Sequence, residues 1–299
     1  MHFIHHHRQD YALQALCGLM SVPRSAYYRW VARVAEAQGA APAEAAEAAA
    51  QGRQEINYLT LWQFHRHKRR YGTRRMVAEL ADLGHRVSRD RVRAIYHKYG
   101  LRAIQPKSFV PKTTQTHPNR RRSPNLLLDA PPPELPDRVW VGDITYLPLQ
   151  NANFCYLACL QDACSRTIVG YAVANHMREE LTLAALEKAI QWRQPAPGLI
   201  VHTDGGGQYS SIAFRQRLSE AGYRSSMTRR NNHYDNATEA ESFFSRLKAE
   251  LLAEGRRFVD LAQAQAECFD YIEGYYNTVR RHSANWYQSP LNFEKGLVW

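Results

Sequence analysis

The sequence lacks the features that would place it in a membrane or in an oxidising compartment. No stretch approaches the roughly 18 consecutive apolar residues that a membrane-spanning helix needs, and residues 1–7 do not contain the apolar segment of a secretory signal. The five cysteines are odd in number and form no Cys-x-x-Cys pair, so neither a disulfide framework nor a zinc finger is expected. A Walker A loop is also missing, which argues against a nucleotide-driven enzyme. We therefore expect a cytoplasmic protein without membrane contact.

The composition is that of a folded globular protein. Hydrophobic residues make up 44% and charged residues 22% of the 299 residues, close to the averages of soluble domains. A chain of this length forms one to three domains with sizeable cores. This excludes a peptide hormone or a miniprotein.

Basic residues are concentrated in the first part of the chain. Residues 1–136 contain 22 Lys or Arg and 10 Asp or Glu, whereas residues 137–299 contain 17 and 18, so the net charge of +11 comes from the first part. A solvated basic surface is the ordinary explanation of such an excess. Its segregation, however, favours a polyanionic partner, and we expect nucleic acid.

Two segments of this basic part follow a helix-turn-helix pattern. Residues 11–33 predict two helices around a turn, with Ser21 as N-cap of the second helix and Pro23 in its first turn. In residues 54–105 a helix is followed by a basic run, a second helix that Gly84 ends, and a third that Ser88 caps. Plain helical hairpins with solvated arginines would give the same pattern, but two such units in one basic half favour DNA binding.

Composition and periodicity divide the chain into six segments. An Ala- and Glu-rich spacer separates the two helical units, and eight of the fourteen prolines mark an extended basic linker before the strand-rich part. The last segment predicts one more helix, whose aromatic stripe we assign to packing. The expected boundaries are 1–33 and 54–105 for the helix-turn-helix-like units, 34–53 for the spacer, 106–136 for the linker, 137–255 for the core and 256–299 for the C-terminal helical extension.

From Val139 onward the periodicity changes to that of strands. Three β-rich runs with short breaks between them predict an antiparallel meander. These runs are followed by an amphipathic helix, a short strand, a second helix, another short strand and a long helix from about Ala237 to Leu252. This order, three hairpinned strands and then a β-α-β unit with a terminal helix, is typical of a ribonuclease-H-like α/β fold.

Two aspartates occupy positions in this predicted sheet where a carboxylate is unusual. Asp143 stands in the middle of the first apolar strand, where an ionised carboxylate is costly unless a cation meets it. Asp204 ends a later strand and precedes three glycines, at the carboxyl end where ligands of α/β folds gather. An arginine partner for the first and a simple turn-forming role for the second are the alternatives to a metal site.

A third carboxylate is expected from the long helix, which offers Glu239 and Glu241. At about 100° per residue, Glu241 borders the apolar face of this helix, whereas Glu239 points to the opposite side, towards solvent. Lys248 lies on the same flank as Glu241, two turns on, where it could hold a phosphate near a metal. We therefore predict Glu241 as the third acid.

Three carboxylates are hard oxygen ligands, which suit Mg²⁺ or Mn²⁺ better than zinc. Two such ions close together activate an attacking water or 3′-hydroxyl and stabilise the departing oxygen in a phosphoryl transfer. The sequence thus predicts a site of Asp143, Asp204 and Glu241 that binds two Mg²⁺ or Mn²⁺ ions.

The chain resembles the transposases of the insertion-sequence-3 family, specifically the product of their second reading frame. The resemblance extends over nearly the whole chain in family order, and its motifs are specific in combination. They are YALQALCGLMSVPRSAYYRW, RRYGTRRMVAEL, VWVGDITYLPL, DACSRTIVGYAV, LIVHTDGGGQYSS, SMTRRNNHYDNA, AESFFSRLKAEL and YIEGYYNTVRRHSA.

The resemblance implies an integrase-type catalytic core, like that of retroviral integrases, with a triad that maps onto Asp143, Asp204 and Glu241. The interval between Asp204 and Glu241 is one residue longer than usual in the family, and we expect the loop before the helix to absorb it. The implied reaction joins one element end beside the other and gives a circular intermediate that later integrates. Implied partners are the terminal inverted repeats, target DNA, further copies of the chain, and the helix-turn-helix and leucine-zipper protein of the upstream frame. The implied location of the chain is the bacterial cytoplasm, in association with the nucleoid.

Cations outside the acid site are the candidates for DNA contact. Two rival functions stay open at this stage: a ribonuclease-H-like nuclease or resolvase that cuts without joining, and a helix-turn-helix regulator without catalysis. The acids argue against the regulator, and the two helical units with the basic linker argue against the simple nuclease. The cations that we expect to contact DNA are Arg24, Arg29, Lys68, Arg69, Arg70, Arg74, Arg75, Arg89, Arg93, Arg120, Arg121, Arg122, Arg229, Arg230, Lys248, Arg280 and Arg281.

Overall fold

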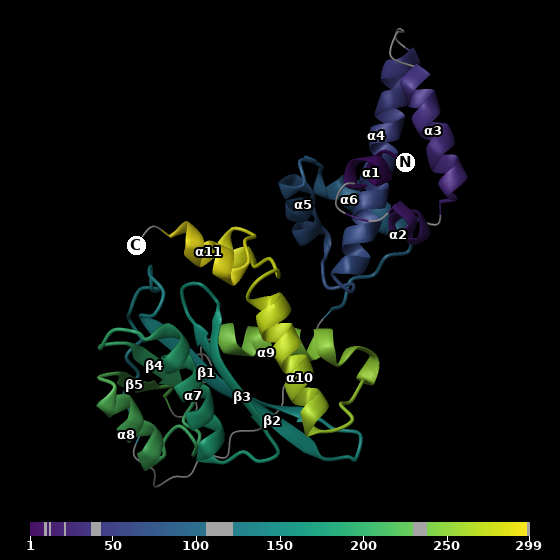
Figure 1. Cartoon of the computed structure of the whole chain (residues 1–299). Helices are drawn as coiled ribbons and strands as arrows, with labels where there is room; N and C mark the ends of the chain where they lie inside the picture. The colour runs from purple at the N-terminus through teal and green to yellow at the C-terminus, as the bar shows by residue number, and fades with distance from the viewer. Residues whose placement is uncertain are drawn as a thin grey trace. The chain divides into compact units, whose positions relative to one another are not determined.

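The structure is a computed structural model that describes residues 1–8, 11, 13–20, 22–36, 43–105, 122–229 and 238–297. The chain separates into two compact units, Met1–Ile104 and Gln105–Trp299 (Figure 1), which are described in turn. In the described part, none of the helices is long and apolar enough to cross a membrane.

The first unit is entirely helical. Helices α2 and α3 match the two helices predicted within residues 11–33, while Ser21, the expected cap, lies outside the described residues. Helix α4 continues without a break through residues 53 and 54, where we expected the spacer to end, so that boundary lies inside a helix. The helices are α1 (His2–His7), α2 (Leu13–Leu19), α3 (Arg24–Glu36), α4 (Ala43–Arg66), α5 (Thr73–Asp82) and α6 (Arg89–Lys98).

Helices α5 and α6 form the predicted pair around a turn. The Ser88 hydroxyl accepts a hydrogen bond from the Arg91 N–H at 3.1 Å, so Ser88 is the predicted N-cap of α6. Gly84 follows α5 with a φ of +86°, a conformation that favours glycine. Val92 and Ile95 are buried in this unit. Because these residues face inward, Arg89 and Arg93 of α6 are exposed.

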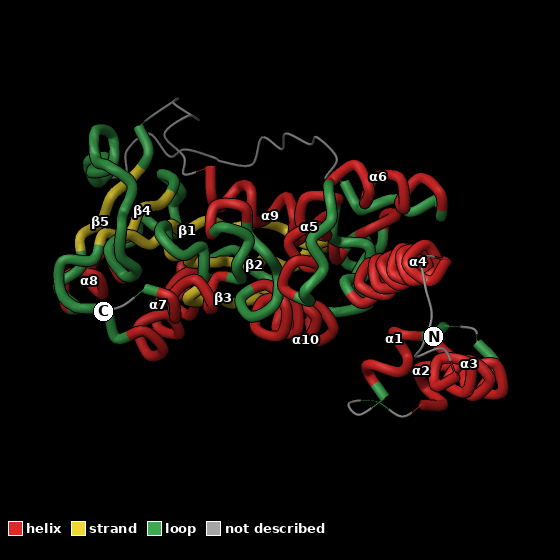
Figure 2. Tube along the Cα trace, turned by 90° about the horizontal axis from the view of Figure 1, so that it is seen from above, coloured by secondary structure: helices red, strands yellow, loops and turns green. Residues whose placement is uncertain are grey.

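The second unit is built on a five-stranded sheet in the order β3-β2-β1-β4-β5. Strands β1, β2 and β3 pair antiparallel, and β4 and β5 extend the sheet in parallel to β1, which confirms the predicted order of elements. Figure 2 shows the strands side by side with helices around them. The elements are β1 (Val139–Pro148), β2 (Phe154–Asp162), β3 (Ile168–Ala174), α7 (Glu179–Arg193), β4 (Ile200–Thr203), α8 (Ile212–Glu220), β5 (Arg224–Met227) and α9 (Thr238–Leu251).

Apolar side chains cover both sides of the sheet. One cluster joins Trp140 and Leu160 of the strands to Leu186 of α7 and Phe214 of α8. The other joins alternate strand residues to α9 and the C-terminal segment, with Leu247 fully buried. Because side chains of a strand alternate between faces, the two clusters take alternate residues of the same strands.

The C-terminal segment is not the single helix that we expected. It consists of α10 (Leu261–Tyr271), a π-helical turn (Ile272–Tyr276), a 3₁₀ turn (Ser283–Asn285) and α11 (Pro290–Gly296). Trp286 and Tyr287 have φ values of +53° and +63°, a conformation that no helix continues through. Its aromatic stripe does pack, as predicted, because Tyr271 and Tyr276 are buried against the sheet side of α9.

The end of the expected linker runs along the outer edge of β5. The Met227 N–H donates to the Pro124 carbonyl oxygen at 3.2 Å, and the Leu126 N–H donates to the Ser226 hydroxyl at 2.9 Å. An exposed strand edge presents unpaired backbone groups that invite aggregation. Residues from Arg122 onward therefore belong to the second unit and cover this edge.

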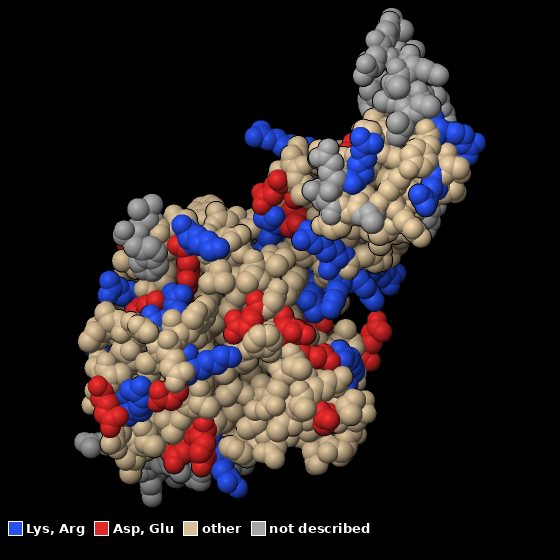
Figure 3. Space-filling view, in the orientation of Figure 1, with Lys and Arg blue, Asp and Glu red and all other residues tan. Residues whose placement is uncertain are grey.

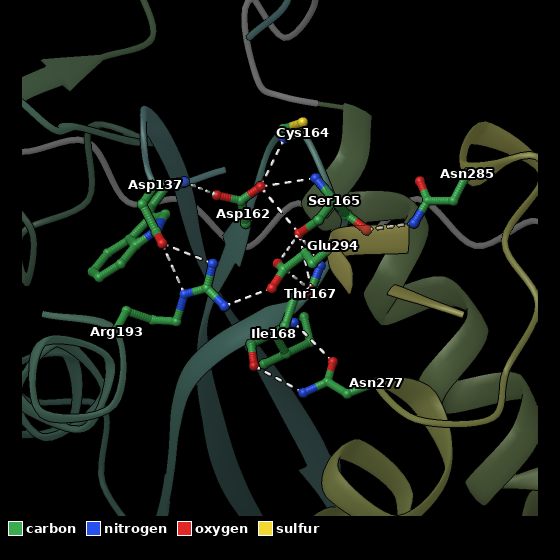
Figure 4. Close-up of polar contacts among 11 residues, drawn as sticks. Asp137, Asp162, Cys164, Ser165, Thr167, Ile168, Arg193, Asn277, Asn285 and Glu294 are labelled. Carbon is green, nitrogen blue, oxygen red and sulfur yellow. Dashed lines mark hydrogen bonds and ion pairs between the residues drawn. The ribbon is translucent and has the colours of Figure 1, made fainter. Parts of the chain in front are cut away.

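A buried polar network ties the C-terminal segment to the sheet (Figure 4). Asp162, at the end of β2, accepts hydrogen bonds from the backbone N–H groups of Asp137, Cys164 and Ser165. Glu294 of α11 accepts from the Thr167 hydroxyl at 2.8 Å and pairs with Arg193 of α7 at 2.7 Å. One network thus fixes the start of β1, the β2–β3 turn, α7 and α11.

Burial raises the pKa of Asp162 to about 6. Because its native pKa lies above its unfolded value, the stability it contributes is fully present below about pH 4 and is lost as pH rises through 6. We expect Asp162→Asn to remove this part of the pH dependence, measured as the free energy of urea unfolding of the full chain between pH 4 and 7. An identical pH slope in the variant and the wild type would contradict the assignment.

Candidate active site

The register between β1 and β4 brings Asp143 and Asp204 to neighbouring strands. Gly142 is paired with Thr203, the last residue of β4; Asp143 follows Gly142 within β1, and Asp204 directly follows β4. Both side chains are partly exposed. Two carboxylates thus lie at the carboxyl end of β4, where ligands of α/β sheets bind.

Glycines shape the backbone around both acids. The Asp143 carboxylate accepts the Ile144 N–H at 2.8 Å, and the Asp204 carboxylate accepts the Gly206 N–H at 2.9 Å. A Cβ on Gly206 would lie 2.8 Å from the Asp204 Oδ1, so a side chain there would displace the carboxylate. A Cβ on Gly142 would lie 2.8 Å from the Leu160 Cδ2, so that position also needs glycine.

Lys248 of α9 lies on the same side of the sheet as Asp143. Its Nζ is 4.0 Å from the centroid of the Tyr146 ring. Burial lowers the pKa of Lys248, and the negative charge of Asp143 acts in the opposite direction. Lys248 and Asp143 therefore interact electrostatically.

Helix α9 carries both candidates for the third acid. Its backbone is helical from Thr238, so positions 239 and 241 belong to its first turn. The side chains of Glu239 and Glu241, and the loop 230–237 that was expected to absorb the extra residue, lie outside the described residues. Glu241 therefore stays a prediction.

Tyr209 is a site residue that the sequence analysis missed. Its hydroxyl is buried and has no hydrogen-bond partner in the described part of the chain. Its Oη is 3.5 Å from the point where a Cβ of Gly142 would lie. Burial, followed by the charges of Asp143 and Asp204, raises the pKa of Tyr209. The only signal in the sequence was its place in the HTDGGGQY motif.

These groups fit a hard divalent cation. Two carboxylates repel each other in a partly buried site, which favours a cation between them, and carboxylate oxygens are what Mg²⁺ and Mn²⁺ prefer. The orphaned hydroxyl of Tyr209 offers a further oxygen beside them. Among the described residues, no cluster of three His, Cys, Asp or Glu could hold a metal.

The expected DNA-binding cations occupy different surroundings in the structure. In the first unit, seven are exposed and Arg70 and Arg75 are partly exposed. Among the charged side chains that Figure 3 shows on that unit, Lys and Arg predominate, whereas the visible face of the core carries both signs. In the core, Arg229 is exposed, and Arg120, Arg121 and Arg230 lie outside the described residues. The seven exposed cations are Arg24, Arg29, Lys68, Arg69, Arg74, Arg89 and Arg93.

Arg280 is a correction to the expected DNA-binding set. Its side chain is 2% exposed, and its Nη2 lies 2.7 Å from the Oε1 of Glu250, which is also buried. Glu250 in turn accepts the Tyr271 hydroxyl at 3.0 Å. A guanidinium enclosed in this way cannot reach a DNA phosphate. Its neighbour Arg281 is partly buried and donates to the Tyr287 carbonyl oxygen at 3.0 Å.

Known families match the second unit and the later part of the first unit. The family described as "Integrase core domain" matches residues 133–233 and, in a second profile of the same description, residues 241–296. The family described as "HTH-like domain" matches residues 62–109. These matches confirm the expected fold class, an integrase-type α/β core preceded by helix-turn-helix-like helices.

Curated relatives cover nearly the whole chain. The transposase InsF of insertion sequence IS3A from Escherichia coli (strain K12) is 35% identical over 98% of this chain and 97% of its own length. The transposase of insertion sequence element IS904 from Lactococcus lactis is 40% identical over 78% of this chain and 90% of its own length. A 31 kDa protein of insertion element IS600 from Shigella sonnei is 36% identical over 94% and 97%.

Solved retroviral structures are more distant. The simian T-cell lymphotropic virus intasome matches 74% of this chain and 71% of that chain, with a TM-score of 0.47 and 15% identity. The HTLV-2 integrase catalytic core domain, solved with magnesium, matches 54% of this chain and 97% of that chain, with a TM-score of 0.41 and 16% identity.

We expect Arg280→Met to lower the free energy of unfolding by about 3–5 kcal/mol, because it leaves the buried Glu250 carboxylate without its cation. The double variant Arg280→Met/Glu250→Gln should recover part of this loss, since Gln is neutral and still accepts the Tyr271 hydroxyl. Urea unfolding of the full chain measures both. A loss below about 1 kcal/mol, typical of an exposed pair, would show that the pair is not buried in solution.

Proposed function

The chain belongs to the transposases of the insertion-sequence-3 family, whose function is DNA transposition, and from that premise we propose that it nicks the ends of its element and joins them to DNA with a divalent cation. The observation that carries this proposal is the β1–β4 register, which puts Asp143 and Asp204 on neighbouring strands at the carboxyl end of β4. A helix-turn-helix regulator would have no use for this arrangement.

In the proposed site Asp143, Asp204 and Glu241 hold two Mg²⁺ or Mn²⁺ ions. When bound, such ions activate the attacking oxygen and stabilise the leaving oxygen of an in-line phosphoryl transfer. Lys248, beside Asp143, supplies a positive charge for a phosphate group. The turn after Asp204 has no side chains at residues 206 and 207, so a DNA backbone can approach the acids closely there.

The first unit is proposed to bind the element ends, with α6 as recognition helix in the major groove. Its exposed side presents Arg89, Arg93 and Lys98, while Val92 and Ile95 anchor it to the unit. Lys68 and Arg69, in the turn before α5, are exposed and suited to phosphate contacts. Target DNA, other copies of the chain and the upstream-frame protein are the further proposed partners.

A strand-transfer assay distinguishes this function from that of a nuclease. A labelled duplex that carries the inverted repeat from the DNA flanking the reading frame is incubated with the full chain and Mg²⁺. A transposase gives labelled strands joined to a second DNA, whereas a nuclease or resolvase of the rival class releases cut ends without these products. If the full chain binds the ends but gives only cut ends and no joined strands, the proposal is wrong.

We expect Glu241→Gln to abolish Mg²⁺-dependent nicking and to leave end binding intact, because it keeps the shape of the side chain and removes the ligand charge. Misplacement of a reacting group by about 1 Å can cost on the order of a hundredfold in rate. Glu239→Gln is the matched control, two residues away on the same helix, and should be nearly silent. An essential Glu239 with a dispensable Glu241 would show that the third ligand is assigned to the wrong residue.

End binding should fall steeply with salt, because phosphate contacts release counterions. We expect Arg89→Ala/Arg93→Ala to weaken end binding and to lower the slope of log K against log salt by about 1 for each of the two arginines that binds a phosphate. Mobility shifts at several salt concentrations measure both. Arg256→Ala, which removes a core arginine paired with Glu267, is the control. Equal slopes in the double variant and the wild type would exclude α6 from phosphate binding.

A further inference from the structure

Arg122 contacts the two chain segments that flank the acid site. Its Nη1 donates to the Gly205 carbonyl oxygen at 3.4 Å, and its Nη2 donates to the Thr228 carbonyl oxygen at 2.6 Å. Gly205 directly follows Asp204, and Thr228 directly follows β5, on the way to α9. One guanidinium therefore joins the turn after the second acid to the segment that leads to the proposed third acid.

The space for this guanidinium exists because residue 205 is glycine. A Cβ built on Gly205 would overlap with the guanidinium of Arg122, which is the group closest to it. The φ of Gly205 lies outside the left-handed region, so alanine would fit the backbone. The three atoms nearest to such a Cβ all belong to Arg122, so its guanidinium is the nearest obstacle to a side chain at residue 205.

The segment that carries Arg122 is held firmly on the core. The Ser123 hydroxyl donates to the Ser225 hydroxyl at 2.8 Å, and Pro124 and Leu126 bond along β5 as described above. The segment that begins at Arg122 thus lies along β5 and next to the turn after Asp204. Arginine suits this place because its planar fork of donors can bind two carbonyl oxygens at once, which a lysine ammonium does not reproduce.

We propose that Arg122 is a positioning residue of the acid site, which clamps the turn after Asp204 to the end of β5 so that the interdomain linker takes part in forming the site. This inference rests on the proposed function. It assigns Arg122 a role different from the general phosphate contact expected of the basic linker. Two of its donors are used by backbone carbonyls, and its positive charge offsets the repulsion between the two acids.

The inference is tested with a mutant cycle in the full chain. Arg122→Ala removes the clamp, Gly205→Ala fills its space, and the double variant does both. Nicking rate, end binding and the Mn²⁺ concentration that half-maximally raises the thermal midpoint are measured for each. Arg138→Ala, an exposed arginine nearby in the sequence, controls for the lost charge, and Asp143→Asn reports on the acid site itself.

We expect each single variant to lose about tenfold or more in nicking and in Mn²⁺ affinity, as is typical for residues that orient metal ligands, with end binding unchanged. The double variant should be no worse than Arg122→Ala, because Gly205→Ala acts only through the guanidinium. Arg138→Ala should match the wild type.

Different results overturn different statements. Wild-type nicking by Gly205→Ala and Arg122→Ala, with none by Asp143→Asn, would refute the clamp and leave the proposed function standing. Losses that multiply in the double variant would also refute it. Equal nicking by the wild type and Asp143→Asn would refute the proposed function itself. If Arg122→Ala merely fails to fold, the Gly205→Ala variant, which keeps the arginine, still decides the inference.

Discussion

Two carboxylates on adjacent parallel strands repel each other, and the core must hold them together against that force. The pairing of β1 with β4 does so by backbone hydrogen bonds. Because Gly142 is paired with Thr203, these bonds place Asp143 level with Asp204, the residue that follows β4. Apolar clusters on both faces of the sheet keep the strands from shifting. Because a one-residue slip would turn Asp143 to the other face of the sheet, the packing that stabilises the fold also specifies the acid pair.

Several charged side chains elsewhere in the core form ion pairs with one another. The buried Arg280 pairs with Glu250, and Arg193 pairs with both Asp137 and Glu294. Pairs of this kind contribute little net stability compared with apolar packing, but removing one partner is costly. Their main effect is therefore to hold the C-terminal segment in place on the sheet and its helices.

Local patterns in the sequence predicted the helices and strands, but they could not predict the contacts between segments that lie far apart in the sequence. The cap at Ser88 and the succession of strands and helices along the chain each depend on a few neighbouring residues. Arg280 was misassigned because its partner Glu250 lies 30 residues away, on α9, and a basic pair such as RR carries no sign of burial. Tyr209 and the contacts of Arg122 were missed for the same reason, since both depend on which glycine lies opposite.

The position of Glu294 has a consequence for synthesis on the ribosome. Helix α11 follows all five strands along the chain, yet its carboxylate bonds to hydroxyls in the β2–β3 turn. The strands can pair as they emerge, but the turn cannot acquire its buried partner until α11 has been translated. In the described part of the chain, the helical unit of residues 1–104 packs within itself. Since domains fold in the order of their synthesis, a chain interrupted late would possess a finished helix-turn-helix unit and an unfinished core.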